Sequence, residues 1–292
     1  MDKIIDYTPE QLRQIQLCGL EMMIEVDRIC WKNNIKYSMA GGTLIGAARH
    51  KGFIPWDDDV DVMFTPIEYE KFCEACKTDL DESRFFFQDY RTDKEYRWSY
   101  GKLRRLGTEY IKAGYENAKF RTGVCIDVFD YEYLPDGKIK RMLYRAEMFL
   151  VRKMQYSQVG RTRDKKAINR FMYSLLYKIP KAAVFKYREH ITSLYVPNES
   201  SRIYNIMLPP KRKECDNGFP REWFEEFTEL EFEGMLFPAL KEYDKFLSVR
   251  YGDYMKLPPV EMRKGVMEAS KLELLDLNLE DLQEIYRKGR QA

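Results

Sequence analysis

The sequence predicts an α/β (α+β) fold in which a mixed sheet is flanked by helices and carries a basic helical elaboration. Three observations predict it: two proline-containing capping boxes that open helices beside short strands, one long apolar strand at 123–130, and a basic, aromatic-rich helical stretch at 137–195. The chain has 292 residues, 45% of them apolar, which suits one large core. We expect a core at 1–136, a basic helical insertion at 137–199 and a C-terminal part at 200–292 that packs on the core.

The first elements follow from capping signals and apolar spacing. Thr8-Pro9-Glu10-Gln11 is a capping box with proline at the first helical position, and apolar residues at helical spacing continue this helix to about Asn33. Residues 35–39 alternate like a short strand. Gly41-Gly42-Thr43 is then expected to form a turn at the mouth of a helix over 43–50.

The second strand is expected at 58–64. Its apolar side chains would share one face, and Asp59 and Asp61 would share the other, because side chains alternate along a strand. Thr65-Pro66-Ile67-Glu68 repeats the capping signature and predicts a helix to about Thr78.

The later elements are predicted from short apolar runs. The strand at 123–130 is apolar on both faces except at Asp127, so we expect it near the centre of the sheet. A polar residue inside such a strand costs free energy unless it has a partner. Pro180 divides the helices expected over 137–195. The other expected elements are strands at 85–88, 98–104, 108–111 and 228–232 and a helix over about 239–250.

The composition excludes several classes of protein. No apolar run approaches the roughly 18 residues of a membrane-spanning helix, and the first residues lack the layout of a signal peptide, so we expect a cytoplasmic location. Among six cysteines only Cys73 and Cys76 have metal-like spacing, and the two histidines, His50 and His190, do not complete a zinc site. So few histidines also argue against a Ser-His-Asp or Cys-His mechanism. If the protein is an enzyme, we expect carboxylates and a bound cation to carry out its catalysis.

Three aspartates are the candidate carboxylates. Asp59 and Asp61 would repel each other unless a cation or hydrogen bonds neutralise them. The expected partner is Mg²⁺ or Mn²⁺, held by two carboxylates, substrate phosphates and water. Asp127 is the natural third carboxylate, which would complete the metal sphere, act as a base toward an acceptor hydroxyl, or do both. We therefore predict Asp59, Asp61 and Asp127 as catalytic residues and metal ligands.

A phosphate site is predicted beside these carboxylates. Gly41 and Gly42 allow close approach of the backbone to a ligand, and the amides that open the next helix favour a phosphate. Thr43 adds a hydroxyl donor. A glycine pair alone more often marks a plain turn, so the prediction depends on its position directly before the acidic strand.

Four basic side chains are further candidates for substrate binding. Lys102 and Arg104 would share a strand face and neutralise a diphosphate, although a solvated strand face is an equal alternative for either one. Arg49 and Lys51 lie between the glycine pair and the acidic strand. A phosphate cradle beside a metal site is what phosphoryl-group transfer requires.

Two other interpretations of the acidic cluster were weighed. Asp57, Asp59, Asp61 and Glu68 fall at positions 1, 3, 5 and 12 of an EF-hand loop, but Val62 stands where that loop needs glycine. An Asp-x-Asp motif of sugar-nucleotide glycosyltransferases also ends a strand and binds a metal-diphosphate. That motif does not predict Gly-Gly-Thr one helix upstream, which makes it the lesser candidate.

The charge distribution singles out one segment. Net charge is +2, yet residues 138–188 carry fifteen Lys and Arg against Glu147 and Asp164, a local balance of +13 that leaves −11 for the rest of the chain. This segment is either a solvated helical face or a surface for anionic lipid, a lipid-linked diphosphate or an acidic polymer. We expect no nucleic acid partner, since no recognised nucleic-acid module is present.

Taken together, these residues resemble the LicD family of phosphocholine transferases, in the nucleotidyltransferase-fold superfamily, with a distant similarity to fukutin-related protein. The resemblance covers roughly 10–135 and 225–262. The matching stretches are Gly41–Ala47, Arg49–Asp61, Lys102-Leu103-Arg104 with Gly107-Thr108, Ile126-Asp127-Val128-Phe129, and Tyr251-Gly252-Asp253-Tyr254-Met255 before Pro258-Pro259.

The resemblance implies a nucleotidyltransferase-like sheet and a specific reaction. Gly42 and Thr43 would bind phosphate, Asp59 and Asp61 would hold the metal, and Asp127 would be the third acid. The family transfers phosphocholine from CDP-choline to a hydroxyl of a glycan or lipid-linked glycopolymer, such as a teichoic acid or lipopolysaccharide, and releases CMP.

Several alternatives stay open at this point. They are another CDP-alcohol such as CDP-ribitol or CDP-glycerol, nucleotidyl transfer, and a nucleotide- or glycan-binding module without activity. A basic segment that contacts anionic lipid would place the protein at the inner face of the membrane.

Overall fold

The computed structural model describes residues 4–113, 115–194, 200–205, 215, 217–265 and 268–290. Its α-helices are α1 (Pro9–Lys32), α2 (Gly41–His50), α3 (Pro66–Asp79), α4 (Lys138–Arg163), α5 (Ala167–Tyr177), α6 (Lys181–Ser193), α7 (Tyr243–Tyr251) and α8 (Leu279–Gly289). Its strands are β1 (Ser38–Met39), β2 (Asp61–Phe64), β3 (Phe85–Gln88), β4 (Gly101–Arg105), β5 (Glu109–Lys112), β6 (Cys125–Asp130), β7 (Glu132–Leu134), β8 (Arg202–Tyr204), β9 (Phe219–Pro220), β10 (Phe227–Phe232), β11 (Met235–Leu240) and β12 (Ala269–Glu273). The predicted mixed α/β fold is confirmed.

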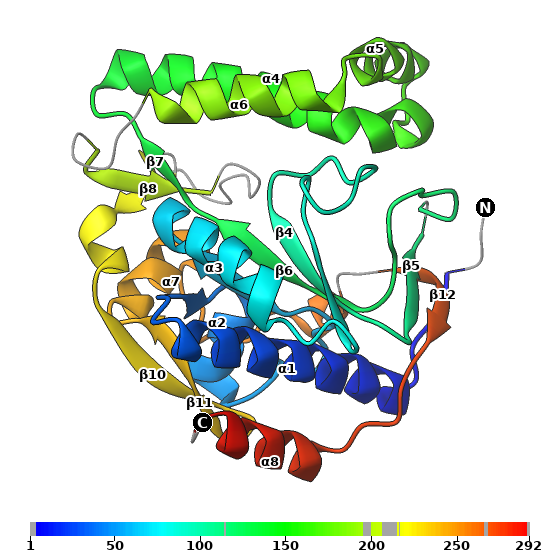
Figure 1. Ribbon diagram of the computed structural model, residues 1–292, viewed down its shortest axis with the longest axis vertical. Coiled ribbons are helices and arrows are strands. Elements are labelled where there is room, and N and C mark those ends of the chain that lie inside the picture. Colours follow the sequence, from blue (N-terminus) through cyan, green and yellow to red (C-terminus); the bar gives the residue numbers. More distant parts are fainter. Residues whose placement is uncertain are drawn as a thin grey trace.

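The largest sheet has five strands in the order β1-β2-β6-β4-β3 (Figure 1). Only β2 and β6 pair in parallel, and the other neighbours are antiparallel. Strand β6 is central, as its apolar run predicts. The connection from β2 to β6 passes through α3, β3, β4 and β5, so residues far apart in the sequence meet in the middle of the sheet.

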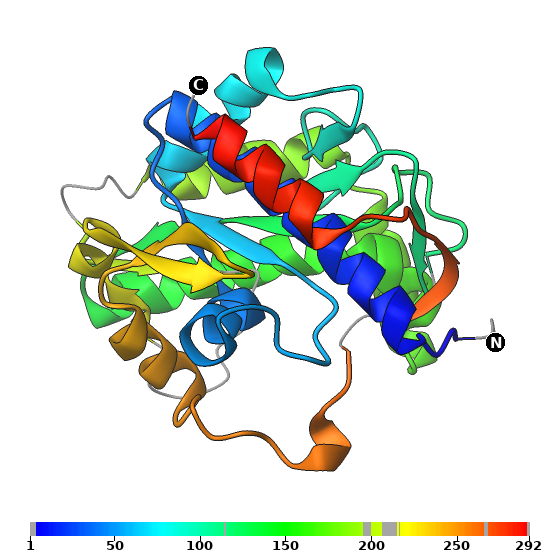
Figure 2. The same cartoon turned by 90° about the horizontal axis from the view of Figure 1, so that it is seen from below.

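Helices α1 and α3 cover one face of this sheet. A Cβ on Gly19 of α1 would lie 2.8 Å from Val60 and 4.0 Å from Ile126. The rings of Phe72 in α3 and Phe64 in β2 stack at 5.0 Å. Helix α8 lies along α1 on the outside, which Figure 2 shows most clearly. Side chains alternate along a strand, so in β2, β6 and β4 the residues next in sequence to those that face α1 and α3 point to the opposite face of the sheet.

The C-terminal segment packs on the N-terminal core. The β10–β11 hairpin lies next to β1, where the amide of Leu240 donates to the hydroxyl of Ser38 at 3.1 Å. Strand β12 pairs with β5. One buried apolar cluster therefore includes residues of the N-terminal helices α1, α2 and α3 together with Phe246 and Leu247 of α7 and Leu282 of α8. The extents of the three predicted parts of the chain stay a prediction.

Helices α4, α5 and α6 form a separate layer, drawn at the top of Figure 1. A small apolar cluster holds α4 and α6 to β7 and β8; it consists of Leu134, Tyr144, Met148, Val151, Val184, Ile191 and Tyr204. At its edge, the buried guanidinium of Arg188 pairs with Asp130 and Glu132. Pro180 is the N-cap of α6 and separates it from α5, as expected.

Three local predictions were wrong. Gly41 and Gly42 form the first turn of α2 instead of preceding it. Asp59 lies before β2, which begins at Asp61, so the two residues do not share a strand. Residues 239–240 end strand β11, because this segment pairs with β10 along its whole length and α7 starts only at Tyr243.

Candidate active site

Three charged side chains stand in one row across the centre of the sheet. Asp61 of β2 is in register with Asp127 of β6, and Asp127 is in register with Lys102 of β4. Cross-strand neighbours on one face lie close enough to interact directly. The ammonium group of Lys102 forms an ion pair with the carboxylate of Asp127. This pair provides the partner that a charged residue in a central strand requires.

Asp59 lies beside this row and shares its electrostatics. Burial raises the pKa of Asp59 well above its ordinary value, and the charges of Asp61, Asp57 and Asp127 raise it further. Burial also raises the pKa of Asp61 to about 8; Asp127 and Asp57 add to the shift, and Lys102 and Arg250 oppose it. Each of these two carboxyl groups therefore tends to keep its proton, because ionising it would add negative charge that its surroundings do not balance.

The lysine of the row stays charged. Burial lowers the pKa of Lys102, but the negative charge of Asp127, with contributions from Cys125 and Tyr100, outweighs burial and raises this pKa above its ordinary value. The row thus holds a permanent cation paired with Asp127, next to two carboxyl groups, Asp59 and Asp61, whose pKa values are raised.

The helix α2 begins directly against these carboxylates. A Cβ on Gly41 would lie 2.1 Å from Oδ2 of Asp61, and one on Gly42 would lie 2.3 Å from Oδ2 of Asp57. Gly41 also has a φ of +52°, which glycine adopts without strain. The hydroxyl of Thr43 accepts a hydrogen bond from the amide of Asp61 at 2.9 Å. The small residues are therefore needed for close packing of acidic side chains on the start of α2.

The structure directs three predicted binding residues to other partners. Buried Arg104 donates to Oε1 of Gln88 at 2.6 Å and to the carbonyl of Gly123 at 2.9 Å. Arg49 donates to the carbonyl of Tyr254 at 2.6 Å. Lys51 pairs with Glu231 of β10 at 3.2 Å. The residues that do gather at the carboxylates are Gly41, Gly42, Thr43 and Lys102. A role of the other three in substrate binding stays a prediction.

Arg250 belongs to this site and was not expected. It lies on α7 with 3% of its surface exposed, and its charge lowers the pKa of Asp61. Its Nε donates to the hydroxyl of Tyr251 at 3.1 Å. Burial raises the pKa of Tyr251, and Asp61 and Asp59 contribute. The segment 251–255, which directly follows Arg250, is one of the stretches that carry the family resemblance. It is the pattern in the sequence that could have drawn attention to Arg250.

Aromatic rings surround the Lys102 end of the row. The Lys102 ammonium lies 5.3 Å from the centroid of the Tyr100 ring. Trp98 lies 6.5 Å from Tyr100 and 6.2 Å from Tyr156 of α4, between ring centroids. Burial raises the pKa of Tyr115; the charge of Lys102 opposes this shift and Tyr156 adds to it. The segment before β4, the loop after β5 and helix α4 supply these aromatic rings.

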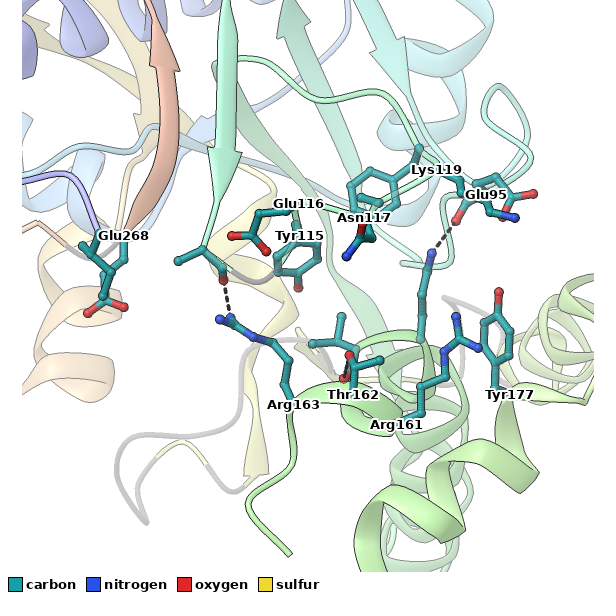
Figure 3. A pocket seen from close by; sticks show the side chains of 16 residues that line it. Glu95, Tyr115, Glu116, Asn117, Lys119, Arg161, Thr162, Arg163, Tyr177 and Glu268 are labelled. Carbon is teal, nitrogen blue, oxygen red and sulfur yellow. Dashed lines mark hydrogen bonds between the residues drawn. The ribbon is translucent and has the colours of Figure 1, made fainter. Parts of the chain in front are cut away.

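A polar cavity of about 700 Å³ adjoins the cluster at Tyr115 (Figure 3). The loop after β5 supplies Tyr115, Glu116 and Asn117 from one side, and the end of α4 supplies Arg161 and Arg163 from the other. Further lining groups are the aromatic rings of Phe120 and Tyr177 and the carboxylates of Glu95 and Glu268. Rings with carboxylate, amide and guanidinium groups can hold a polar ligand that also has apolar faces.

One feature of the site, the raised pKa values of Asp59 and Asp61, favours binding of a divalent cation. In the part of the chain that the structure describes, no three His, Cys, Asp or Glu side chains form a ready set of ligands. The raised pKa values of Asp59 and Asp61 nevertheless mark two oxygen-donor groups whose charge a cation would balance. Mg²⁺ is commonly held by only one or two carboxylates together with substrate phosphates.

Comparisons with known proteins show what the chain resembles. Residues 34–145 match the family model described as LicD/FKTN/FKRP, nucleotidyltransferase domain. This range contains the glycine pair, the acidic row and Lys102.

Relatives are found over different lengths. The chain is 29% identical over 257 residues to the lipopolysaccharide cholinephosphotransferase LicD of Haemophilus influenzae, covering 87% of this chain and 94% of that protein. A stretch of 64 residues is 38% identical to an uncharacterised protein of Rickettsia prowazekii, covering 20% of this chain and 24% of that protein. A stretch of 42 residues is 50% identical to an uncharacterised protein of Rickettsia typhi, covering 14% of each. The chain thus resembles the LicD family over residues 34–145, and its likeness to the cholinephosphotransferase over most of its length indicates an enzyme of the transferase class.

Proposed function

We propose that this enzyme transfers phosphocholine from CDP-choline to a hydroxyl of a cell-surface glycan or lipid-linked glycopolymer, and that CMP is released. The observation that carries the proposal is the row of Asp61, Asp127 and Lys102 against the start of α2, with Asp59 beside it. The lipopolysaccharide cholinephosphotransferase named above supports the choline and glycan parts. We further propose a cytoplasmic location.

Asp59 and Asp61 would hold Mg²⁺ or Mn²⁺, with Asp127 as a third ligand or as the base. The cation would supply positive charge that neutralises the diphosphate of the donor. The two aspartates alone are favourable ligands, because binding a cation relieves the repulsion that raises their pKa values. The amides that open α2 favour phosphate oxygens on the same side.

Asp127 is proposed as the general base. The acceptor hydroxyl gives its proton to Asp127 as its oxygen forms a bond to the phosphorus that bears choline. The bond from this phosphorus to the oxygen of the leaving CMP breaks at the same centre. Lys102 holds the carboxylate of Asp127 in place through the ion pair before the acceptor binds. This pairing differs from the diphosphate contact that the sequence suggested for Lys102.

The aromatic cluster supports choline as the transferred group. A quaternary ammonium binds over the faces of aromatic rings, and the ring of Tyr100 already accommodates the Lys102 cation at 5.3 Å. Trp98 and Tyr156 extend the same cluster. CDP-ribitol or CDP-glycerol would not use such rings in this way, so they are the lesser candidates. The cavity at Tyr115 is the proposed site of the acceptor glycan.

The proposal is tested by CMP release from CDP-choline with and without Mg²⁺. CDP-ribitol and CDP-glycerol serve as competing donors, and identification of the product separates phosphocholine transfer from nucleotidyl transfer, which leaves the nucleotide on the acceptor. Asp59→Asn and Asp61→Asn should each abolish release. The exposed Asp276→Asn is the matched control and should keep full activity. Full activity of either site variant would refute the metal assignment.

A further inference from the structure

The outer side of helices α4 and α5 carries apolar residues that the fold does not cover. On α4 they recur at helical spacing, and they are Ile139, Met142, Leu143, Ala146, Phe149 and Leu150. On α5 they fall at i, i+3, i+4 and i+7, and they are Ile168, Phe171, Met172 and Leu175. Ile139 is 72% exposed, Ile168 70% and Phe171 62%. Such spacing creates one continuous apolar stripe on each helix.

Both stripes lie opposite the residues that anchor their helices. On α4 the buried residues Tyr144, Met148 and Val151 contact the small cluster with β7 and β8, about half a turn away from the exposed stripe. On α5 the only buried residue is Tyr173, which accepts a hydrogen bond from Lys153 at 3.0 Å and packs on Gly160 of α4. Each helix thus has two apolar sides, and the residues that the structure describes cover only one of them.

Basic side chains flank these stripes. The guanidinium of Arg152 and the ammonium of Lys153 lie 5.5 Å and 5.2 Å from the exposed ring of Phe149. Lys138 and Lys140 are exposed at the start of α4, and Lys165 and Lys166 are exposed between α4 and α5. The segment 138–188 that contains these helices has the local balance of +13. Apolar residues bordered by cations are the composition of a helix that lies in a membrane interface.

We propose that the outer side of α4 and α5 binds the surface of an anionic lipid bilayer. Apolar side chains would enter the headgroup region while Lys and Arg bind lipid phosphates, and both contributions act in the same orientation of the protein. A second copy of the chain is a poorer occupant, because an isologous dimer through this side would bring two strongly positive segments together. Among the helices that the structure describes, none has the length and hydropathy needed to cross a bilayer.

The test is sedimentation of the full chain with vesicles. One preparation contains phosphatidylcholine alone and the other also contains about a third phosphatidylglycerol. We expect sedimentation with the anionic vesicles only, and weaker sedimentation when the salt concentration is raised from about 50 to about 500 mM, since salt screens the basic residues. Absence of binding to both preparations, or equal binding to both at all salt concentrations, overturns the proposal.

Two sets of variants assign the binding to this side of the molecule. Phe149→Ser with Phe171→Ser should reduce the affinity at least about tenfold, because both rings would otherwise enter the interface. The matched control is Val260→Ser with Met262→Ser, which are 71% and 64% exposed outside α4 and α5. All four side chains are on the surface, so circular dichroism should show an unchanged fold. A control that loses as much affinity as the test variant contradicts the proposal.

Charge is tested separately. Lys138→Glu with Lys140→Glu should weaken binding to anionic vesicles by about tenfold, whereas Lys94→Glu with Lys245→Glu, exposed on other elements, should leave it unchanged. Sedimentation velocity is measured on the same proteins. A dimer that the Phe149 and Phe171 changes disrupt, without vesicle binding, would show that a second copy covers this side. Binding to soluble polyphosphate without vesicle binding would show a free acidic polymer as the partner. Either result overturns the lipid assignment.

Discussion

Replacing Gly41 by alanine should inactivate the enzyme, while the same change at Gly137 should not. Gly41 has a φ of +52° and Gly137 has a φ of +91°, so both substitutions place a side chain on a left-handed backbone. A Cβ at position 41 would also lie 2.1 Å from Oδ2 of Asp61, whereas nothing lies within 4 Å of one at position 137. The pair therefore separates backbone strain from collision with the carboxylate.

The two effects differ in size. The backbone strain costs on the order of 1–3 kcal/mol in each variant, and each kcal/mol lowers the melting temperature by about 2–4 °C. Relief of the collision requires the Asp61 carboxylate or the start of α2 to move by about 1 Å, since ordinary contacts of a Cβ begin at 3.4 Å. A displacement of about 1 Å in a catalytic group can cost about 100-fold in rate. Gly41→Ala should therefore lose about 100-fold in kcat/KM and Gly137→Ala less than about twofold.

The assay is CMP release from CDP-choline at saturating Mg²⁺, with melting curves of both variants recorded in the same buffer. Two results would refute the reasoning. One is Gly41→Ala activity within about twofold of the parent enzyme, and the other is an equal loss in both variants, which would make strain rather than the Asp61 contact the cause.

Three more results are expected. In metal-free protein the pKa of Asp61 is raised to about 8, so between about pH 4 and pH 8 the folded state binds a proton that the unfolded state has released. The melting temperature should therefore fall as the pH rises through this range. Asp61→Asn should flatten this profile, and an unchanged slope would contradict the assignment. Arg250→Met should raise the pKa of Asp61 further and shift the acidic limb of the pH–rate profile upward, while Arg250→Lys shifts it less; profiles that coincide with the parent would remove Arg250 from the site. Tyr100→Leu should raise the KM for CDP-choline by about 3- to 30-fold through loss of a cation–π contact, with Tyr100→Phe near the parent; equal effects would indicate that the hydroxyl, not the ring, binds the donor.

Local signals in the sequence were sufficient for much of the fold. The hydroxyl of Thr8 accepts a hydrogen bond from the amide of Gln11, and Thr65 does the same for Glu68, so the starts of α1 and α3 depend on neighbouring residues only. The central position of β6 followed from its apolar composition. Asp127 was predicted as a third acid for the same reason, since a lone carboxylate in a central strand requires a partner.

The rest depended on contacts that sequence distance hides. The charge of Arg250 acts on Asp61 because the β10–β11 hairpin, which directly precedes α7, packs beside β1 and α2, and no local pattern predicts that packing. Lys102 and Arg104 share a strand face as predicted, yet different neighbours determine their partners: Asp127 binds one and Gln88 the other. The sequence predicts a helix from about Ala239, whereas Ala239 and Leu240 end strand β11, because pairing with β10 determines the structure of these two residues.

The packing of α8 on α1 also bears on how the chain is made. Arg290 pairs with the buried carboxylate of Asp27 at 3.0 Å, and Leu282 is 2% exposed in the common core. During translation the aspartates and glycines of the site leave the ribosome before Arg250 and α8 do. At that stage the nascent chain carries its acidic cluster without the guanidinium of Arg250 that accompanies it in the folded state. The site is therefore complete only after α7 has been made, and a chain truncated before α7 should be inactive rather than partly active.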